Sequence, residues 1–281
     1  MRVNVESLWR RWQMPVRGWP RPVVLKSGEM RIRYFLPIAL TAFAATVPVI
    51  KWKTGDRSRP LPVMVTPGEP STQQHAGTAP SDAVQLFNGT DLAAWQQHDG
   101  KPIAWKLRDG YFEVAPGTGD IVTKQPFGDC QLHVEWATPN PPHGADQEPG
   151  NSGVYLHSLY EIQVLESNRN KTYADGQAGA IYCQYPPLVN PARPPGEWQT
   201  YDIVFHGPRF APDSKLLEPA TVTLLFNGVL AQDHAMPTGP TDYMKRPPYK
   251  ATPAKLPLLL QDHGQAVRYR NIWIRELKAT E

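Results

Sequence analysis

The sequence predicts an all-β domain, a two-sheet antiparallel β-sandwich of jelly-roll type. The chain of 281 residues contains 31 prolines, 21 glycines and nine tryptophans, a composition that favours strands joined by many turns. About a dozen short runs of alternating hydrophobicity follow residue 83, with turn residues between them. After residue 54 the sequence has no long amphipathic helical pattern and no repeat at a fixed period. So many short strands suit antiparallel pairing in two packed sheets.

The expected strands follow one another along the chain. They lie within residues 84–89, 104–117, 119–124, 130–139, 152–157, 160–166, 179–185, 197–207, 220–234, 256–264 and 267–277. Asp109-Gly110 and Asn227-Gly228 divide two of these runs as hairpin turns, because both dipeptides readily adopt the left-handed backbone that short hairpins need. Long loops, where binding sites often lie, are expected at 137–150, 186–196 and 235–255.

Charge divides the chain into two parts. Residues 1–53 carry ten Lys or Arg and two Asp or Glu, a net charge of +8. Residues 54–281 carry nineteen Lys or Arg and twenty-four Asp or Glu, a net charge of −5. The overall charge of +3 therefore originates in the N-terminal part. Because the remainder is mildly acidic, we expect no nucleic-acid partner.

Residues 30–53 have the pattern of an export signal. Two arginines precede a largely apolar run at 34–50, and Ala42-Phe43-Ala44 offers an A-x-A cleavage site. The 29 residues before Met30 are long for the basic part of a signal, which is explained if translation begins at Met30. An uncleaved membrane anchor is an alternative, since about 17 apolar residues can just span a bilayer. A third interpretation is that the apolar run is a buried segment of the protein core. The sequence predicts an exported protein, periplasmic or extracellular, with a membrane tether through 34–50 if the signal is not cleaved.

The chain is expected to have three regions. Residues 1–53 form a basic extension with the signal peptide or anchor. Residues 54–82 are rich in Pro, Gly, Ser and Thr and poor in aromatics, which is typical of a flexible tether. The folded domain covers 83–281. Within it, Cys130 fits the buried face of a strand, and export would permit a disulfide with Cys183 that spacing alone cannot establish.

Polar side chains share a face on two of the expected strands. Glu161 and Gln163 lie two residues apart, opposite the apolar residues of their strand. Gln261 and His263 repeat this arrangement near the C-terminus. If the two faces coincide, these four side chains line one polar groove on a sheet.

These strands resemble the 3-keto-disaccharide hydrolase family, a former domain of unknown function with a concanavalin A-like lectin/glucanase sandwich. The matching motifs occur in order: LFNGTDLAAW, NSGVYLHSLYEIQVLES, GAIY, GEWQTYDI, LFNGVLAQD and LPLLLQDHGQAVRYRNIWIREL. Together they cover most of residues 84–278, and their order is more specific than any single motif. One departure is Glu166, since the family's central motif commonly ends in Asp at that position.

The resemblance implies an exported enzyme acting on disaccharides or other glycosides that carry a ketone at C3. The ketone acidifies the proton on C2, so a base can remove it, and the enolate then expels the substituent on C1. Water addition completes net hydrolysis. This route needs one general base, an enolate stabiliser and an acid for the leaving group. A divalent metal is a candidate stabiliser, with Glu and His as plausible ligands.

The expected catalytic residues are Glu161, as base or metal ligand, and His263, as acid or metal ligand. Each also has a purely structural interpretation: Glu161 could be a solvated carboxylate on a strand, and His263 could cap the end of a strand. Gln163 and Gln261 are expected to hydrogen-bond the sugar, although a carboxamide can equally bond the backbone.

Five further residues are expected to bind the substrate: Asn151, Tyr155, His157, Trp198 and Arg270. Alternation with Tyr155 places His157 near the groove. Asn151 has a competing role in a turn, and Arg270 could orient an oxyanion or pair with Glu161. Trp198 could stack on a sugar ring or belong to the core.

Two other classes of function are compatible with the sequence. A lectin-type binding module would have the same fold without chemistry, and would leave Glu161 and His263 apart. An ordinary glycosidase would need a second carboxylate about 5–10 Å from Glu161. Glu166 and Asp262 are available for that role, although neither has a clear claim.

Overall fold

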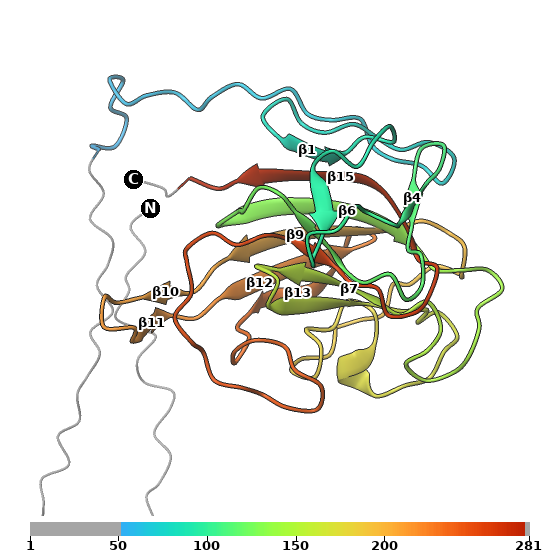
Figure 1. The fold of residues 1–281 in the computed structure, drawn as a ribbon. Helices are drawn as coiled ribbons and strands as arrows, with labels where there is room; N and C mark the ends of the chain where they lie inside the picture. The colour runs from blue at the N-terminus through green and yellow to red at the C-terminus, as the bar shows by residue number, and fades with distance from the viewer. Residues whose placement is uncertain (1–51, 279–281) are drawn as a thin grey trace, which may run out of the picture. The chain divides into compact units, whose positions relative to one another are not determined.

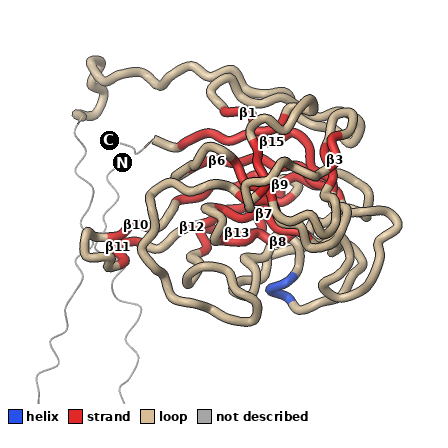
Figure 2. The backbone as a smooth tube through the Cα atoms, in the orientation of Figure 1, coloured by secondary structure: helices blue, strands red, loops and turns tan. Residues whose placement is uncertain are grey.

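The computed structural model describes residues 52–278. The expected export signal, cleavage site and membrane tether at 34–50 lie outside the described residues. Within residues 52–278 no helix is both long and apolar enough to cross a membrane. The described chain consists almost entirely of strands and loops, together with a short 3-10 helix, η2 (Ala174–Gly176) (Figure 2).

The larger of two sheets has eight strands. Its order is β13 (Val229–Ala235), β12 (Thr221–Phe226), β9 (Gln199–His206), β6 (Cys130–Ala137), β15 (Arg268–Glu276), β4 (Phe112–Glu113) and β3 (Lys106–Leu107), while β1 (Val84–Phe87) also pairs with β15. The long strands β6, β9 and β15 form its centre (Figure 1).

The smaller sheet has five strands. Its order is β2 (Trp95–Gln97), β5 (Ile121–Thr123), β14 (Leu259–Leu260), β7 (Ser152–Leu156) and β8 (Tyr160–Val164). A separate ribbon pairs β10 (Arg209–Phe210) with β11 (Leu216–Glu218). Every strand pair in both sheets and in the ribbon is antiparallel. The predicted all-β antiparallel sandwich is therefore confirmed.

Alternation along the strands builds the core between the sheets. In β9, Tyr201, Ile203 and Phe205 are buried, whereas the residues between them face outward. The Tyr201 ring packs edge-on against Trp136 at 5.2 Å and against Phe226 at 4.9 Å. Fully burying one such side chain stabilises the fold by about 1.5–3 kcal/mol. The core thus follows from the period-two pattern that predicted the strands.

Two buried phenols from the larger sheet reach across the core to the smaller sheet. The Tyr201 hydroxyl donates to the carbonyl of Gln163 in β8 at 2.6 Å. The Tyr269 hydroxyl lies 2.7 Å from the Ser152 Oγ in β7. A buried tyrosine needs a partner for its hydroxyl, and here both partners belong to strands of the opposite sheet. These contacts fix the two sheets relative to each other.

Both predicted hairpin turns are present. Asp109-Gly110 joins β3 to β4, with Gly110 at φ +78°. Asn227 and Gly228 join β12 to β13 with φ +50° and +78°, the left-handed backbone of a tight hairpin. In this part of the chain Cys130 and Cys183 are both buried, and they form no disulfide with each other.

The region expected to be a flexible tether is partly ordered against the domain. Residues 69–78, here called the strap, form a closed loop in which Thr78 donates to the carbonyl of Glu69 at 3.1 Å. The strap lies on the outer face of the larger sheet, beside β15 (Figure 1). The expectation of a tether over 54–82 is wrong for this stretch, because its polar groups find partners on the sheet that composition does not reveal.

Candidate active site

A pocket lies on the face of the smaller sheet that points away from the core. Its volume is about 350 Å³. Its lining residues come from β7, β8, the segment after β14 and two long loops: Asn151, Tyr155, Glu161, Gln163, Tyr182, Thr241, Asp242, Tyr243, Gln261 and His263. The structure therefore brings together the four side chains that the sequence places on shared strand faces. Asn151 and Tyr155 join them.

Glu161 is the most deeply enclosed acid of the pocket. Only 3% of its surface is exposed. Its backbone N–H donates to Thr241 Oγ1 at 2.9 Å, and the Tyr155 hydroxyl donates to its Oε2 at 2.8 Å. Burial raises the pKa of the Glu161 carboxyl to about 8, with a further contribution from the charge of Asp120, while the bond from Tyr155 opposes the rise. The carboxyl therefore holds its proton to a higher pH than an ordinary glutamate does.

Gly153 makes room for this carboxyl. It pairs with Gln163 across β7 and β8. A Cβ at position 153 would lie 2.6 Å from Glu161 Oε1 and 2.6 Å from Tyr155 Cε2. Glycine is therefore required here by the approach of two pocket side chains, and not by an unusual backbone conformation.

Gln261 carries a free acceptor into the pocket. Its Nε2 donates to the Tyr155 hydroxyl at 3.1 Å, whereas its buried Oε1 has no hydrogen-bond partner among the described residues. Its backbone is fixed on both sides, since its N–H donates to the Gly153 carbonyl at 3.0 Å and its carbonyl accepts from Ser152 Oγ at 2.6 Å. A buried acceptor without a partner is costly. A hydroxyl group of a bound ligand would satisfy it.

His263 lies at the exposed mouth of the pocket, in the segment that follows β14. Its neighbour Asp262 fixes that segment to the end of β5. The Asp262 N–H donates to Asp120 Oδ1 at 2.8 Å, and its own Oδ2 accepts from the Gly119 N–H at 2.9 Å. Burial raises the pKa of Asp120. Asp262 therefore positions His263, and its carboxylate is held by backbone outside the pocket lining.

Glu166 likewise has a structural role. Its carboxylate accepts the backbone N–H groups of Asn168, Arg169 and Asn170 at 2.9, 3.1 and 3.0 Å. The extra methylene relative to Asp lets one side chain reach three successive amides. Neither Glu166 nor Asp262 is thus free to act as a second catalytic carboxylate.

Sequence reasoning missed four lining residues. Thr241, Asp242 and Tyr243 belong to the loop predicted at 235–255, and Tyr182 belongs to the GAIY motif. The sequence analysis did identify the loop and the motif. Neither pattern, however, shows which of their side chains point into the pocket. Tyr182 is anchored by a hydroxyl contact of 2.6 Å with Tyr173. The Asp242 carboxylate lies 3.6 Å from Lys245 Nζ.

The prediction that His157 lies near the groove is wrong. The strand β7 ends at Leu156, and His157 and Ser158 have φ angles of +54° and +53°, so the alternation that begins at Tyr155 stops there. The His157 ring instead packs edge-on against Phe205, with centroids 4.8 Å apart. It lines the core side of the fold rather than the pocket.

Trp198 and Arg270 also lie away from the pocket. Both lie on the outer face of the larger sheet, where the Arg270 guanidinium is 4.3 Å from the centre of the Trp198 ring. Arg270 pairs with Glu135 at 2.6 Å, not with Glu161. Period-two alternation identifies the residues that share a face, but not the sheet to which a strand belongs. The predicted sugar and oxyanion contacts of these two residues are therefore wrong in location.

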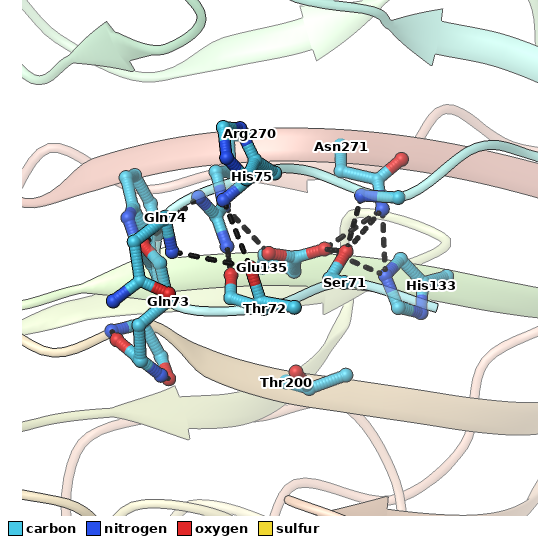
Figure 3. A network of polar contacts seen from close by, with 12 residues as sticks. Ser71, Thr72, Gln73, Gln74, His75, His133, Glu135, Thr200, Arg270 and Asn271 are labelled. Atoms are coloured by element: carbon cyan, nitrogen blue, oxygen red, sulfur yellow. Dashed lines mark hydrogen bonds and ion pairs between the residues drawn. The ribbon is translucent and has the colours of Figure 1, made fainter. Parts of the chain in front are cut away.

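The strap covers this second polar cluster (Figure 3). Ser71 Oγ contacts Glu135, and Arg270 donates to the Thr72 carbonyl at 2.5 Å. The Gln73 carboxamide makes two bonds to the Trp198 backbone, at 2.9 and 2.7 Å. These contacts explain why residues outside the expected domain boundary are ordered.

The cluster beneath the strap is strongly charged. Burial alone would lower the pKa of His133, but the carboxylates of Asp202, at 2.7 Å, and Glu135, at 3.3 Å, outweigh it and raise that pKa to about 9. Burial alone would raise the pKa of Glu135, but hydrogen bonds from His133, Ser71 and Asn271 lower it. Arg270 adds to that effect. The cluster is thus an ion-pair network on the outer face of the sheet.

The structure offers no cluster of ligands for the candidate divalent metal among residues 52–278. Among residues 52–278, no three His, Cys, Asp or Glu side chains are grouped so that they could hold one ion. Glu161 and His263, the plausible ligands, share the pocket, but a third such side chain does not join them in that way.

The fold and the pocket define a β-sandwich protein with a polar cavity of the size of a sugar. The chain belongs to the family of 3-keto-alpha-glucoside-1,2-lyase-like domains, which matches residues 82–275. A crystal structure from Parabacteroides distasonis, of a protein provisionally named a glycosyl hydrolase, is 42% identical, with a TM-score of 0.76 over 80% of this chain and 95% of that chain.

Two further structures with the same provisional name, also from Parabacteroides distasonis, share the fold. One is 22% identical, with a TM-score of 0.50 over 70% of this chain and 94% of that chain. The other is 21% identical, with a TM-score of 0.50 over 69% of this chain and 99% of that chain. No curated protein matches the chain. The family and the more similar structure identify a glycan-acting enzyme.

Proposed function

We propose that the protein cleaves the glycosidic bonds of 3-keto-disaccharides and other 3-keto-glycosides by elimination followed by hydration. The observation that carries the proposal is the buried Glu161 carboxyl, held by Tyr155, with a pKa raised to about 8. A general base works best when its pKa lies near the working pH, so this carboxyl is suited to remove a weakly acidic C–H proton. The family assignment supports a substrate with a ketone at C3.

The reaction proceeds in two stages. The Glu161 carboxylate takes the proton from C2, and the C2–H electron pair forms the C2=C3 enolate. Collapse of the enolate re-forms the C3 ketone and places the double bond between C1 and C2, while the C1–O bond breaks. The leaving oxygen takes a proton from an acid, and the proposed acid is His263, which lines the pocket. Water then adds across C1=C2, with hydroxyl at C1 and hydrogen at C2, which gives net hydrolysis.

The carboxamides and hydroxyls of the pocket orient the sugar. Gln261 Oε1 is a buried acceptor without a protein partner in the described chain, so it suits a ring hydroxyl. Asn151 and Gln163 provide further polar groups, and Tyr182 and Tyr243 line the pocket with aromatic rings. Each hydrogen bond to such a group fixes orientation, which is the main requirement for removing one particular proton.

An ordinary glycosidase is the alternative that the structure keeps open, because Asp242 also lines the pocket. In that reaction the neutral Glu161 would be the acid and Asp242 the base or nucleophile. The two mechanisms differ in their need for the second carboxylate. Elimination needs the ketone and does not need Asp242.

The test compares a 3-keto-disaccharide with its unoxidised counterpart. We expect turnover of the keto sugar alone, slowed by deuterium at C2 if proton removal limits the rate. Glu161→Gln should lower kcat by about 10²–10⁴-fold, the range for a positioned general base, with the fold intact. Asp242→Asn is the control and should retain activity. Hydrolysis of the plain disaccharide with dependence on both carboxylates would establish the glycosidase instead. Sugar binding without turnover would indicate a lectin-type module.

His263 is tested through the leaving group. If His263 protonates the leaving oxygen, His263→Ala should strongly slow a 3-keto-glycoside with an alkyl leaving group. A nitrophenyl glycoside, whose leaving group needs no proton, should be much less affected. Equal loss with both substrates would contradict the role of an acid.

The proposal includes export to the periplasm or the extracellular space. The basic, apolar and small-residue pattern at 30–53 supports it. Cell fractionation of the full chain, followed by N-terminal sequencing of the recovered protein, distinguishes a cleaved signal from an anchor. Recovery of the intact chain from the cytosol would contradict export.

A further inference from the structure

Two phenols meet at one side of the pocket. The Tyr182 ring lines the pocket, and its hydroxyl lies 2.6 Å from the hydroxyl of Tyr173, with the ring centres 6.2 Å apart. Either hydroxyl can be the donor of this bond. Two phenols joined in this way have one hydrogen between their oxygens and a second hydrogen left to donate elsewhere. When Tyr173 donates to Tyr182, that second hydrogen belongs to Tyr182 and can be donated to a ligand in the pocket.

Backbone hydrogen bonds hold both phenols in place. The Tyr182 N–H donates to the Glu161 carbonyl at 3.2 Å, which fixes this residue beside the proposed base. The next N–H, of Cys183, donates to the Asp175 carbonyl at 2.9 Å and so ties the same segment to η2. Tyr173 immediately precedes η2 in the chain. The two hydroxyls therefore meet because the backbone brings their segments together.

The segment that carries Tyr182 extends the smaller sheet beyond β8. Backbone bonds of Glu161 and Gln163 join residues 179–182 to the edge of β8 that does not face β7. On the other side, β8 pairs with β7, and β7 pairs with β14. The order across the pocket face is therefore β14, β7, β8 and residues 179–182. Because His263 follows β14, Glu161 lies between His263 and Tyr182.

This order matches the order of the reacting atoms in the proposed elimination. C2 is bonded to both C1 and C3, so these two carbons lie on either side of it. With C2 at the Glu161 carboxylate and the C1 oxygen at His263, the oxygen on C3 faces the side that carries Tyr182. When the C2 proton leaves, the C2–H electron pair forms C2=C3 and the C3 oxygen takes the negative charge. Burial raises the pKa of the Tyr182 hydroxyl, so this hydroxyl keeps its proton and can donate to that oxygen.

We propose that Tyr182 is the catalytic residue that stabilises the enolate oxygen on C3, and that Tyr173 is a positioning residue that donates to Tyr182. A hydroxyl hydrogen turns to suit its partners, so an oxyanion draws the hydrogen of Tyr182 and leaves that of Tyr173 for the bond between the phenols. Each bond in such a chain polarises the next one, so Tyr173 strengthens the donor. This inference deepens the proposed function and rests on it for the placing of the substrate.

The test uses a 3-keto sugar with hydrogen in place of the C1 substituent, 1,5-anhydro-3-keto-glucitol. Its C2 proton can be removed, but no group can leave from C1. In heavy water the full-length protein should replace that proton by deuterium, which proton NMR follows as the loss of the C2 signal. Tyr182→Phe should slow this exchange by about 10²–10³-fold, the range for one oxyanion donor. It should lower kcat for a 3-keto-disaccharide by a similar factor.

Two further variants complete the set. Tyr173→Phe should slow the exchange by about two- to tenfold, the range of one ordinary hydrogen bond, because Tyr182 stays in place and loses its donor. Tyr111→Phe is the matched control, since its ring packs against Trp198, away from the pocket, and it should retain both exchange and cleavage. If Tyr182→Phe does not fold, Tyr173→Phe decides, and exchange at the unaltered rate in that variant overturns the inference.

Exchange separates the role at C3 from other roles of Tyr182. If Tyr182 served the leaving oxygen instead, Tyr182→Phe would cleave slowly but exchange the C2 proton at the unaltered rate, and the inference would be wrong. The same measurement distinguishes the inference from the proposed function. If the unaltered protein exchanges and cleaves, and Tyr182→Phe does so equally fast, only the inference fails. If the unaltered protein neither exchanges the C2 proton nor cleaves 3-keto-glycosides, the proposed function fails, and the inference fails with it.

Discussion

Adding one methyl group at Gly153 tests whether the pocket depends on the observed packing of Glu161. In Gly153→Ala, the new Cβ would lie 2.6 Å from Glu161 Oε1 and 2.6 Å from Tyr155 Cε2, whereas ordinary contacts begin near 3.4 Å. One or both side chains must therefore retreat by about 0.8 Å. Both lie in a pocket wall where Tyr155 is also bonded to Gln261, so the displacement affects the base and its support together.

The expected loss is larger in rate than in stability. A displacement of about 1 Å of a reacting group can lower the rate by about 10²-fold, because the proton and its acceptor no longer align. Overpacking a well-packed site typically costs about 1–3 kcal/mol of folding free energy. We therefore expect kcat/KM for a 3-keto-disaccharide to fall by about 10²-fold, measured with steady-state kinetics, and urea unfolding to show a stability loss within that range.

Gly207→Ala is the matched control. Its Cβ would meet the His157 ring at 2.6 Å, the same distance, but in a part of the fold remote from the pocket lining. We expect Gly207→Ala to lose comparable stability and to retain kcat/KM. If Gly153→Ala keeps full activity, or if both variants lose activity equally, the packing of Glu161 against Gly153 does not control the reaction.

Two further predictions concern stability. Burial lowers the pKa of His157 below its usual 6.5, partly offset by the Phe127 carbonyl, so the folded state favours the neutral ring. The stability due to that ring is present above pH 6.5 and is lost as the pH falls through the folded-state pKa. The urea midpoint of unfolding should therefore fall on acidification, and it should fall less steeply in His157→Phe. The same slope in both proteins would contradict a buried neutral ring. In the strap, Gln73→Ala removes two bonds to the Trp198 backbone and should lower the free energy of unfolding by about 1–2 kcal/mol without changing kcat/KM. A flexible tether would give no change in either quantity.

The fold was predictable because its signals are local. Alternation shows directly which residues of a strand face the core, and the Asn227-Gly228 turn fixes one hairpin. The same reasoning placed Glu161 and Gln163 on one face of their strand, and Gln261 and His263 on one face of theirs. Their meeting in one pocket depends on β14 pairing with β7, which in turn pairs with β8, a long-range arrangement that the periodicity does not show.

The errors arise where local patterns carry no information on distant partners. The strap has the composition of a linker, yet its order comes from charged groups on β6 and β15 that lie far away in the sequence. Arg270 was expected at the sugar, but its strand, β15, belongs to the sheet opposite the pocket. The predicted position of His157 is wrong for a third reason. His157 and Ser158 both have positive φ, which ends the alternation of the strand one position early.

The phenols that cross the core also restrict how the molecule can move. Tyr201 binds the carbonyl of Gln163, and Tyr269 binds Ser152, so the sheets cannot slide past each other without breaking buried bonds directly behind the pocket. The wall that carries Glu161 is therefore a rigid backing, and any opening or closing around a sugar must come from the segments in front of it. Thr241 and Tyr243 lie on such a segment. Thr241 is itself tied to that wall, because its Oγ1 accepts from the Glu161 N–H and its N–H donates to the Leu159 carbonyl. Substrate entry should therefore displace Tyr243 and the other segments in front of the wall, while Thr241 and the strands beneath it stay in place.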